Sequence, residues 1–126
     1  MSLGVRAGLV MLLLAGCAEA GPVPGWQLAT DFKPSPVPYQ VPVANVAVAL
    51  EDSTWRFNGA RISESKFLAL AKASVDLSPR PGLLVDFSSV SEPAEKRRMM
   101  IAIASAAECS ADFPCLEGTK AEYYPR

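Results

Sequence analysis

The stretch TWRFNGARISE, residues 54–64, decides the fold. Its first four residues put two aromatic side chains on one face of a strand, because side chains alternate between the two faces. Asn58-Gly59 follows, and both residues tolerate the positive φ angles of a two-residue hairpin loop. A short returning strand leads to Ser63, a good helix N-cap, and Glu64 places a negative charge where it suits the helix dipole. The stretch therefore predicts a β-hairpin that runs directly into an α-helix.

Strand and helix patterns alternate on both sides of this hairpin. Strands that alternate with two helices predict a two-layer α/β (α+β) domain, a small mixed sheet with both helices on one face. We expect Met100, Ile103, Ala104 and Ala107 to form the inner stripe of the second helix. The expected order is β-β-(β)-α-β-α-β, with strands at Val43–Leu50, Thr54–Phe57 and Ala60–Ile62, a helix at about Glu64–Val75, a strand at Leu83–Phe87, a helix from Ser91 or Glu92 to about Glu108, and a final edge strand at Cys115–Thr119.

The first apolar run ends in Leu14-Ala15-Gly16-Cys17, which resembles the lipobox of bacterial lipoproteins. A short basic start and a short apolar segment precede it, in the layout of a secretory signal and too short to span a bilayer. The resemblance implies that Cys17 becomes the acylated first residue of the mature chain, with the lipid as the membrane anchor. The alternative is an ordinary signal peptide cut near Ala20.

The proline-rich segment after Cys17 predicts an extended tether, because proline ends helices and removes the backbone donors that a sheet needs. We divide the chain into a signal peptide at 1–16, an acylated N-terminus and tether at 17–42, a periplasmic domain at 43–119 and a tail at 120–126. Stretched out, the tether would reach about 75–80 Å. Trp26, Phe32 and Tyr39 are unusual in a pure spacer, and docking of these rings on the domain or on a partner stays open.

Two cysteines, Cys109 and Cys115, remain after lipidation of Cys17. An even number in an exported chain favours a disulfide, which would close a loop of about seven residues and contribute about 2–2.5 kcal/mol. Free thiols are the alternative, and so is a metal pair, which would need two carboxylate ligands because the sequence has no histidine.

Composition argues against catalysis and against nucleic-acid binding. The net charge is -1, too balanced for an electrostatic nucleic-acid binder, and without histidine there is no imidazole base. We expect no enzyme activity and no cofactor beyond the lipid on Cys17. A cell-wall hydrolase or inhibitor stays open, with Asp86 and either Glu51 or Asp52 as a carboxylate pair.

Two groups of residues are candidates for binding a partner. Lys96, Arg97 and Arg98 form a basic cluster suited to anionic lipid, peptidoglycan carboxylates or an acidic protein. The alternative is a solvated helix face paired with neighbouring glutamates such as Glu95. Trp55 and Phe57 share a strand face and form either core or, if that face is uncovered, a binding patch.

The run Val46–Leu50 and the hairpin from Phe57 to Glu64 resemble the periplasmic domain of the ExbD/TolR biopolymer-transport family. Leu83–Phe87 and Met99–Glu108 are similar to its next strand and second helix. The family's membrane helix, with its acidic residue, is replaced here by a lipobox, so the resemblance implies a docking or dimerising module without the proton-coupled role.

We expect a lipid-anchored module on the periplasmic side of the outer membrane. By the sorting pattern of enteric lipoproteins, Ala18 rather than aspartate after Cys17 favours the outer over the inner membrane. Its partner would be peptidoglycan or an envelope protein, with self-association through the final strand or a sheet edge. A structural subunit of an envelope secretion or pilus assembly is the other alternative.

Overall fold

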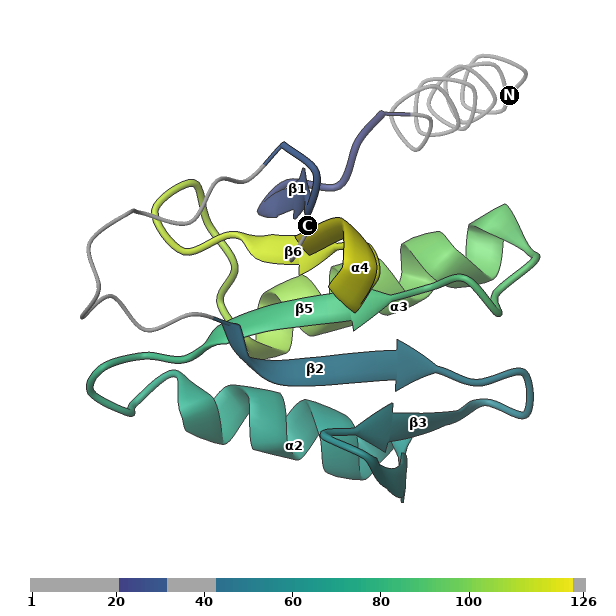
Figure 1. Cartoon of the computed structure of the whole chain (residues 1–126), viewed down its shortest axis with the longest axis horizontal. Coiled ribbons are helices and arrows are strands. Elements are labelled where there is room, and N and C mark those ends of the chain that lie inside the picture. The colour runs from purple at the N-terminus through teal and green to yellow at the C-terminus, as the bar shows by residue number, and fades with distance from the viewer. Residues whose placement is uncertain (1–20, 32–42, 124–126) are drawn as a thin grey trace, which may run out of the picture.

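A computed structural model describes residues 21–31 and 43–123, and within these ranges the chain forms a mixed sheet with three helices (Figure 1). The predicted fold class is confirmed. The strands are β1 (Trp26–Leu28), β2 (Val43–Ala49), β3 (Thr54–Phe57), β4 (Ala60–Ser63), β5 (Gly82–Asp86) and β6 (Cys115–Glu117). The helices are α2 (Glu64–Ser74), α3 (Pro93–Ala106) and α4 (Lys120–Tyr123).

The six strands lie in the order β1-β6-β5-β2-β3-β4. The neighbours β1, β6, β5 and β2 are parallel, whereas β2, β3 and β4 pair antiparallel. A parallel pair needs a crossover connection, and here α2 lies in the connection from β2 to β5 and α3 in the one from β5 to β6. The sheet therefore has a parallel half and an antiparallel half.

The hairpin and the helix cap form as the sequence predicts. Asn58 and Gly59 have φ angles of 50° and 92° between β3 and β4, and the Ser63 hydroxyl accepts a hydrogen bond from the Lys66 amide at 3.1 Å. The Asn58 side chain also accepts a hydrogen bond from the Val46 amide at 2.8 Å, so it joins the hairpin to β2.

The main core lies between the sheet and the pair α2 and α3. Trp55 is 0 % exposed, and its ring lies 4.5 Å from that of Phe67 on α2. On α3 the inner stripe includes Met99 as well as Met100 and Ile103. A smaller cluster on the opposite face contains Ala29, Leu84, Leu116 and Tyr123, and Figure 1 shows α4 beside β5 and β6. The two helical layers therefore differ greatly in extent.

Both predicted limits of the folded domain are wrong. Residues 21–31, expected in the tether, contain β1, which pairs in parallel with β6, and both Val23 and Ala29 are buried. Residues 120–123, expected in the tail, form α4 and bury Tyr123. Consequently β6 is an interior strand rather than the expected edge, since β1 covers its outer side.

The predicted signal segment 1–16 and the predicted lipidation site Cys17 lie outside the described residues, as do Phe32 and Tyr39. Trp26 lies inside them and docks on the domain, where its indole Nε1 donates a hydrogen bond to the Met100 carbonyl at 3.0 Å.

Candidate binding surfaces

The three cations predicted as one binding cluster point to three different partners within the domain. Lys96 forms an ion pair with Glu117 on β6, and its Nζ lies 5.8 Å from the centre of the Phe87 ring. Arg97 donates a hydrogen bond to the carbonyl of Gly21. These two contacts hold α3 to the sheet and to the segment that precedes β1.

Arg98 joins α3 to α2. Its guanidinium contacts both carboxylate oxygens of Glu64, at 2.8 and 3.0 Å, and also Glu95 on its own helix at 2.6 Å. The hydrogen bonds from Arg98 lower the pKa of Glu64 and also that of Glu95. Arg98 is therefore occupied by two carboxylates, and the predicted pairing with neighbouring glutamates is the arrangement observed for it.

Trp55 does not form a binding patch, because α2 covers the face of the sheet on which it lies. Its ring packs against Phe67 and against Phe87, whose centres lie 4.5 and 6.1 Å away. Phe57 is half-buried, and its ring lies 5.6 Å from that of Phe67. The core interpretation of this aromatic pair therefore applies, and the patch interpretation is wrong.

A different pair of cations lies on the opposite face of the sheet. The strand register places Asp86, Val48, Arg56 and Arg61 side by side across β5, β2, β3 and β4, and this row is named the arginine row. Arg61 forms an ion pair with Asp52. Among the described residues, no carboxylate lies within salt-bridge distance of Arg56, which contacts only the Gly59 carbonyl at 3.4 Å.

Two arginines directly opposite each other destabilise a strand pair, because their charges repel. A two-residue hairpin loop at Asn58-Gly59 already implies this pairing, so the hairpin register is the signal in the sequence that brings the two arginines together. The unbalanced charge of Arg56 on an exposed strand makes the arginine row a better binding candidate than the cations of α3.

A groove of about 610 Å³ lies between β1 and the first half of α3, and it is named the β1–α3 groove. Its apolar lining includes Trp26 and Leu28, and Leu28 is 51 % exposed. Lys96 and Arg97 contribute to the same wall. The apolar surface extends through Pro22, Val23, Ala94 and Met100.

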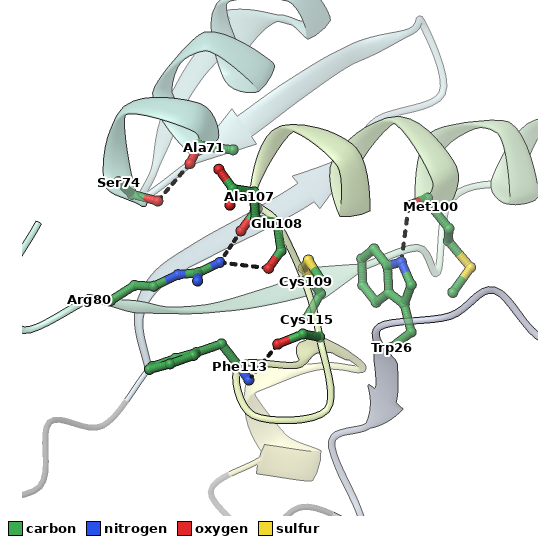
Figure 2. Close-up of a disulfide and its surroundings, with 11 residues drawn as sticks. Trp26, Ala71, Ser74, Arg80, Met100, Ala107, Glu108, Cys109, Phe113 and Cys115 are labelled. Atoms are coloured by element: carbon green, nitrogen blue, oxygen red, sulfur yellow. Dashed lines mark hydrogen bonds between the residues drawn. A yellow bond between two sulfur atoms is a disulfide. The ribbon is translucent and has the colours of Figure 1, made fainter. Parts of the chain in front are cut away.

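The disulfide region lies at the C-terminal end of α3 (Figure 2). Cys109 and Cys115 are joined with their Cα atoms 5.4 Å apart, and the Cys115 amide donates a hydrogen bond to the Gly25 carbonyl at 2.9 Å. Arg80 donates to the carbonyls of Ala107 and Glu108 at the C-terminal end of α3. The disulfide therefore connects the end of α3 to β6, next to the turn that leads into β1.

Two of the three carboxylates considered for a hydrolase, Asp86 and Asp52, accept hydrogen bonds within local turns. Asp86 accepts hydrogen bonds from the amide and the hydroxyl of Ser88. Hydrogen bonds from Thr54, and the nearby charge of Arg61, lower the pKa of Asp52. A general acid in a glycosidase needs a raised pKa, so Asp52 is poorly suited to that role.

No group of three metal-ligating side chains occurs in the ranges 21–31 and 43–123. Within the same part of the chain, none of the helices has the length and the hydropathy needed to cross a bilayer.

No protein-family model matches this chain, and comparisons with curated proteins and with solved structures found no significant match.

Proposed function

We propose that this chain is a non-enzymatic, lipid-anchored binding module of the bacterial envelope. Cys17 carries the lipid in the outer membrane, and the domain faces the periplasm, where it docks on the cell wall or on an envelope protein. The lipobox-like ending at Leu14–Cys17 supports the anchor, and the resemblance of Val46–Leu50 and of the hairpin from Phe57 to Glu64 to the ExbD/TolR periplasmic domain supports the docking role.

The arginine row is the observation that carries the binding role. Arg56 and Arg61 lie in register on neighbouring strands, and the described carboxylates balance only Arg61. A guanidinium binds a carboxylate through two parallel hydrogen bonds, and peptidoglycan presents carboxylates on its peptides. An anionic partner that reaches across β3 and β4 would relieve the repulsion between the two arginines.

The test is co-sedimentation of the mature chain with purified peptidoglycan sacculi, using Cys17→Ser to keep the protein in solution. We expect the chain with both arginines to sediment with the sacculi. The double variant Arg56→Gln, Arg61→Gln should bind at least about tenfold more weakly, because charge-assisted hydrogen bonds contribute about 1.5–3 kcal/mol. Thermal unfolding of the same proteins verifies that the variants remain folded.

The matched control is Lys66→Gln with Lys72→Gln, which removes the same charge from exposed positions on α2. Equal loss in both double variants would mean unspecific attraction by net charge and would contradict a site on the arginine row. Absence of retention for the wild-type surface would contradict the cell-wall version and leave an envelope protein as the partner.

Concentration-dependent assembly well beyond a dimer would favour the alternative of a structural subunit in an envelope complex. The observation behind this second candidate is that β4 forms one edge of the described sheet, with exposed residues at Ala60, Arg61 and Ser63. Strand edges of this kind can pair with another chain.

A further inference from the structure

We propose that the β1–α3 groove rests on the lipid surface in which the chain is anchored. The domain would then stand with β1 at the membrane and β4 away from it. This inference depends on the proposed acylation of Cys17, and the experiment below separates the two.

The covalent length of the anchor carries the first step. Gly21 is held to α3 by Arg97, and Val23 is buried, so the folded part of the chain begins within four residues of Cys17. Four residues reach at most about 13–14 Å in any conformation, because an extended chain spans about 3.3–3.6 Å per residue. The anchor is therefore far shorter than the tether expected from the prolines.

The place where the chain enters the domain decides which surface meets the membrane. Pro22, one residue after Gly21, is itself part of the groove lining. The anchored end and the groove are thus adjacent, whereas the β3–β4 hairpin lies at the opposite end of the strand order. A bilayer within reach of Cys17 faces the groove before any other surface.

The chemistry of the groove suits the boundary between headgroups and acyl chains. Leu28 is half exposed, Pro93 and Ala94 are exposed, and Trp26 forms part of the wall. Tryptophan is enriched at this boundary, and lysine or arginine side chains direct their charges toward the headgroups. Lys96 is already paired with Glu117, so we expect contact with neutral as well as anionic phospholipids.

This orientation also gives the arginine row a direction. Six strands spaced about 4.8 Å apart separate the two sheet edges by about 24 Å. With β1 at the membrane, the opposite end of the sheet faces the cell wall. Arg56 on β3 and Arg61 on β4 lie at that end.

The experiment measures how deeply labelled side chains lie in lipid. The acylated chain is purified from bacterial membranes and placed in vesicles of phosphatidylethanolamine and phosphatidylglycerol. A nitroxide is attached at Leu28→Cys, at Ala94→Cys or, as the control on the distal edge, at Ala60→Cys. Electron paramagnetic resonance compares collisions with oxygen, which concentrates in lipid, against those with a water-soluble nickel chelate.

We expect the ratio of oxygen to nickel collisions to be several-fold higher at positions 28 and 94 than at position 60. Equal, water-like ratios at all three positions in vesicle-bound protein would overturn the inference and leave the anchor intact. Labels at 28 and 94 that are shielded from both reagents would also overturn it, because a second copy or another protein would then cover the groove.

Flotation of the same vesicles tests the anchor independently. We expect the acylated chain to float with lipid, and we expect the Cys17→Ser variant produced without residues 1–16 to remain in solution. A wild-type chain that does not float would overturn the proposed function and this inference together, whereas flotation with water-exposed labels would overturn the inference alone.

Discussion

The two ends of the sheet are built in opposite ways. At one end β3 and β4 are joined by the two residues Asn58 and Gly59, so the pair forms within ten residues of chain. At the other end β1 pairs with β6, and Trp26 lies opposite Cys115 although the two are far apart in the sequence. The hairpin forms between neighbouring residues, whereas β1 forms only by pairing with a strand at the other end of the domain sequence.

The difference shows in what holds each end. The hairpin needs turn residues and the bond from the Val46 amide to the Asn58 side chain. The β1 end is held by three long-range hydrogen bonds to backbone carbonyls. The Trp26 indole donates to Met100, Arg97 donates to Gly21, and the Cys115 amide donates to Gly25. We infer that the β1 end opens more easily unless these long-range contacts and the disulfide are intact.

The largest expected effect comes from a matched pair of glycine substitutions, one at each end. Gly25 and Gly59 both have positive φ, 89° and 92°. A Cβ on Gly25 would lie 2.6 Å from the Cys109 carbonyl oxygen, whereas one on Gly59 has no atom within 4 Å. We expect Gly25→Ala to cost about 2–5 kcal/mol of unfolding free energy and Gly59→Ala about 1–2 kcal/mol.

Urea denaturation of the soluble Cys17→Ser chain measures both costs in the same background. Equal costs for the two variants would contradict the close packing of the turn before β1 against Cys109.

Removal of the disulfide is expected to affect the β1 end selectively. Cys109→Ala with Cys115→Ala should lower the unfolding free energy by about 2–2.5 kcal/mol, because the unfolded chain regains the entropy of a short loop. Hydrogen exchange should accelerate strongly at the Ala29 amide, which bonds to the Glu117 carbonyl. At the Asn58 amide, which bonds to the Val46 carbonyl, the exchange rate should increase less. If both amides accelerate equally, the two ends open as one unit and the comparison fails.

The smallest expected effect lies at the contact between α2 and α3. The Arg98 hydrogen bond holds the pKa of Glu64 below its usual value, so this pair stabilises the fold above the unfolded pKa and the effect is lost as the pH falls through the native pKa. Because the pair is partly exposed, we expect Glu64→Gln to cost about 0.5 kcal/mol near neutral pH, and we expect this cost to shrink as the pH falls through the native pKa of Glu64.

Thermal unfolding across this pH range measures the difference between Glu64→Gln and the wild-type chain. The control is Glu51→Gln, an exposed carboxylate in the turn after β2. A cost for Glu64→Gln that persists in acid would show that the side-chain shape matters rather than its charge.

The elements predicted with the correct type are those with local signals. Asn58-Gly59 and Ser63 specify their turn and cap through their own backbone preferences, and the strand at Leu83–Phe87 follows from an apolar run. The inner stripe of α3 was only partly predicted, because Met99 is buried in the main core, whereas Ala104 is half-buried.

The missed element, β1, has no local signal. Three residues directly after Pro22, Pro24 and Gly25 are too short for a recognisable alternation, and the prolines favoured a tether. Only pairing with β6 makes Trp26–Leu28 a strand. The same reason explains α4, a single turn that is held in place by the burial of Tyr123.

The candidate sites divide in the same way. The sequence placed Lys96, Arg97 and Arg98 together because they are consecutive, yet consecutive residues on a helix point in different directions, and each found its own partner. Arg56 and Arg61 lie five residues apart but become neighbours across the hairpin. Adjacency in the chain is a poor guide to adjacency on a surface.

The sequence alone determined the hairpin, the helix cap and the alternation of strands with helices, because these depend on the φ preferences and hydrophobic periods of a few neighbouring residues. Only the tertiary structure decided where the domain begins, that β6 is interior and which cations remain available for a partner. Those properties arise from contacts between segments as distant as Gly21 and Arg97, whose free energy does not exist until the chain has closed around its core.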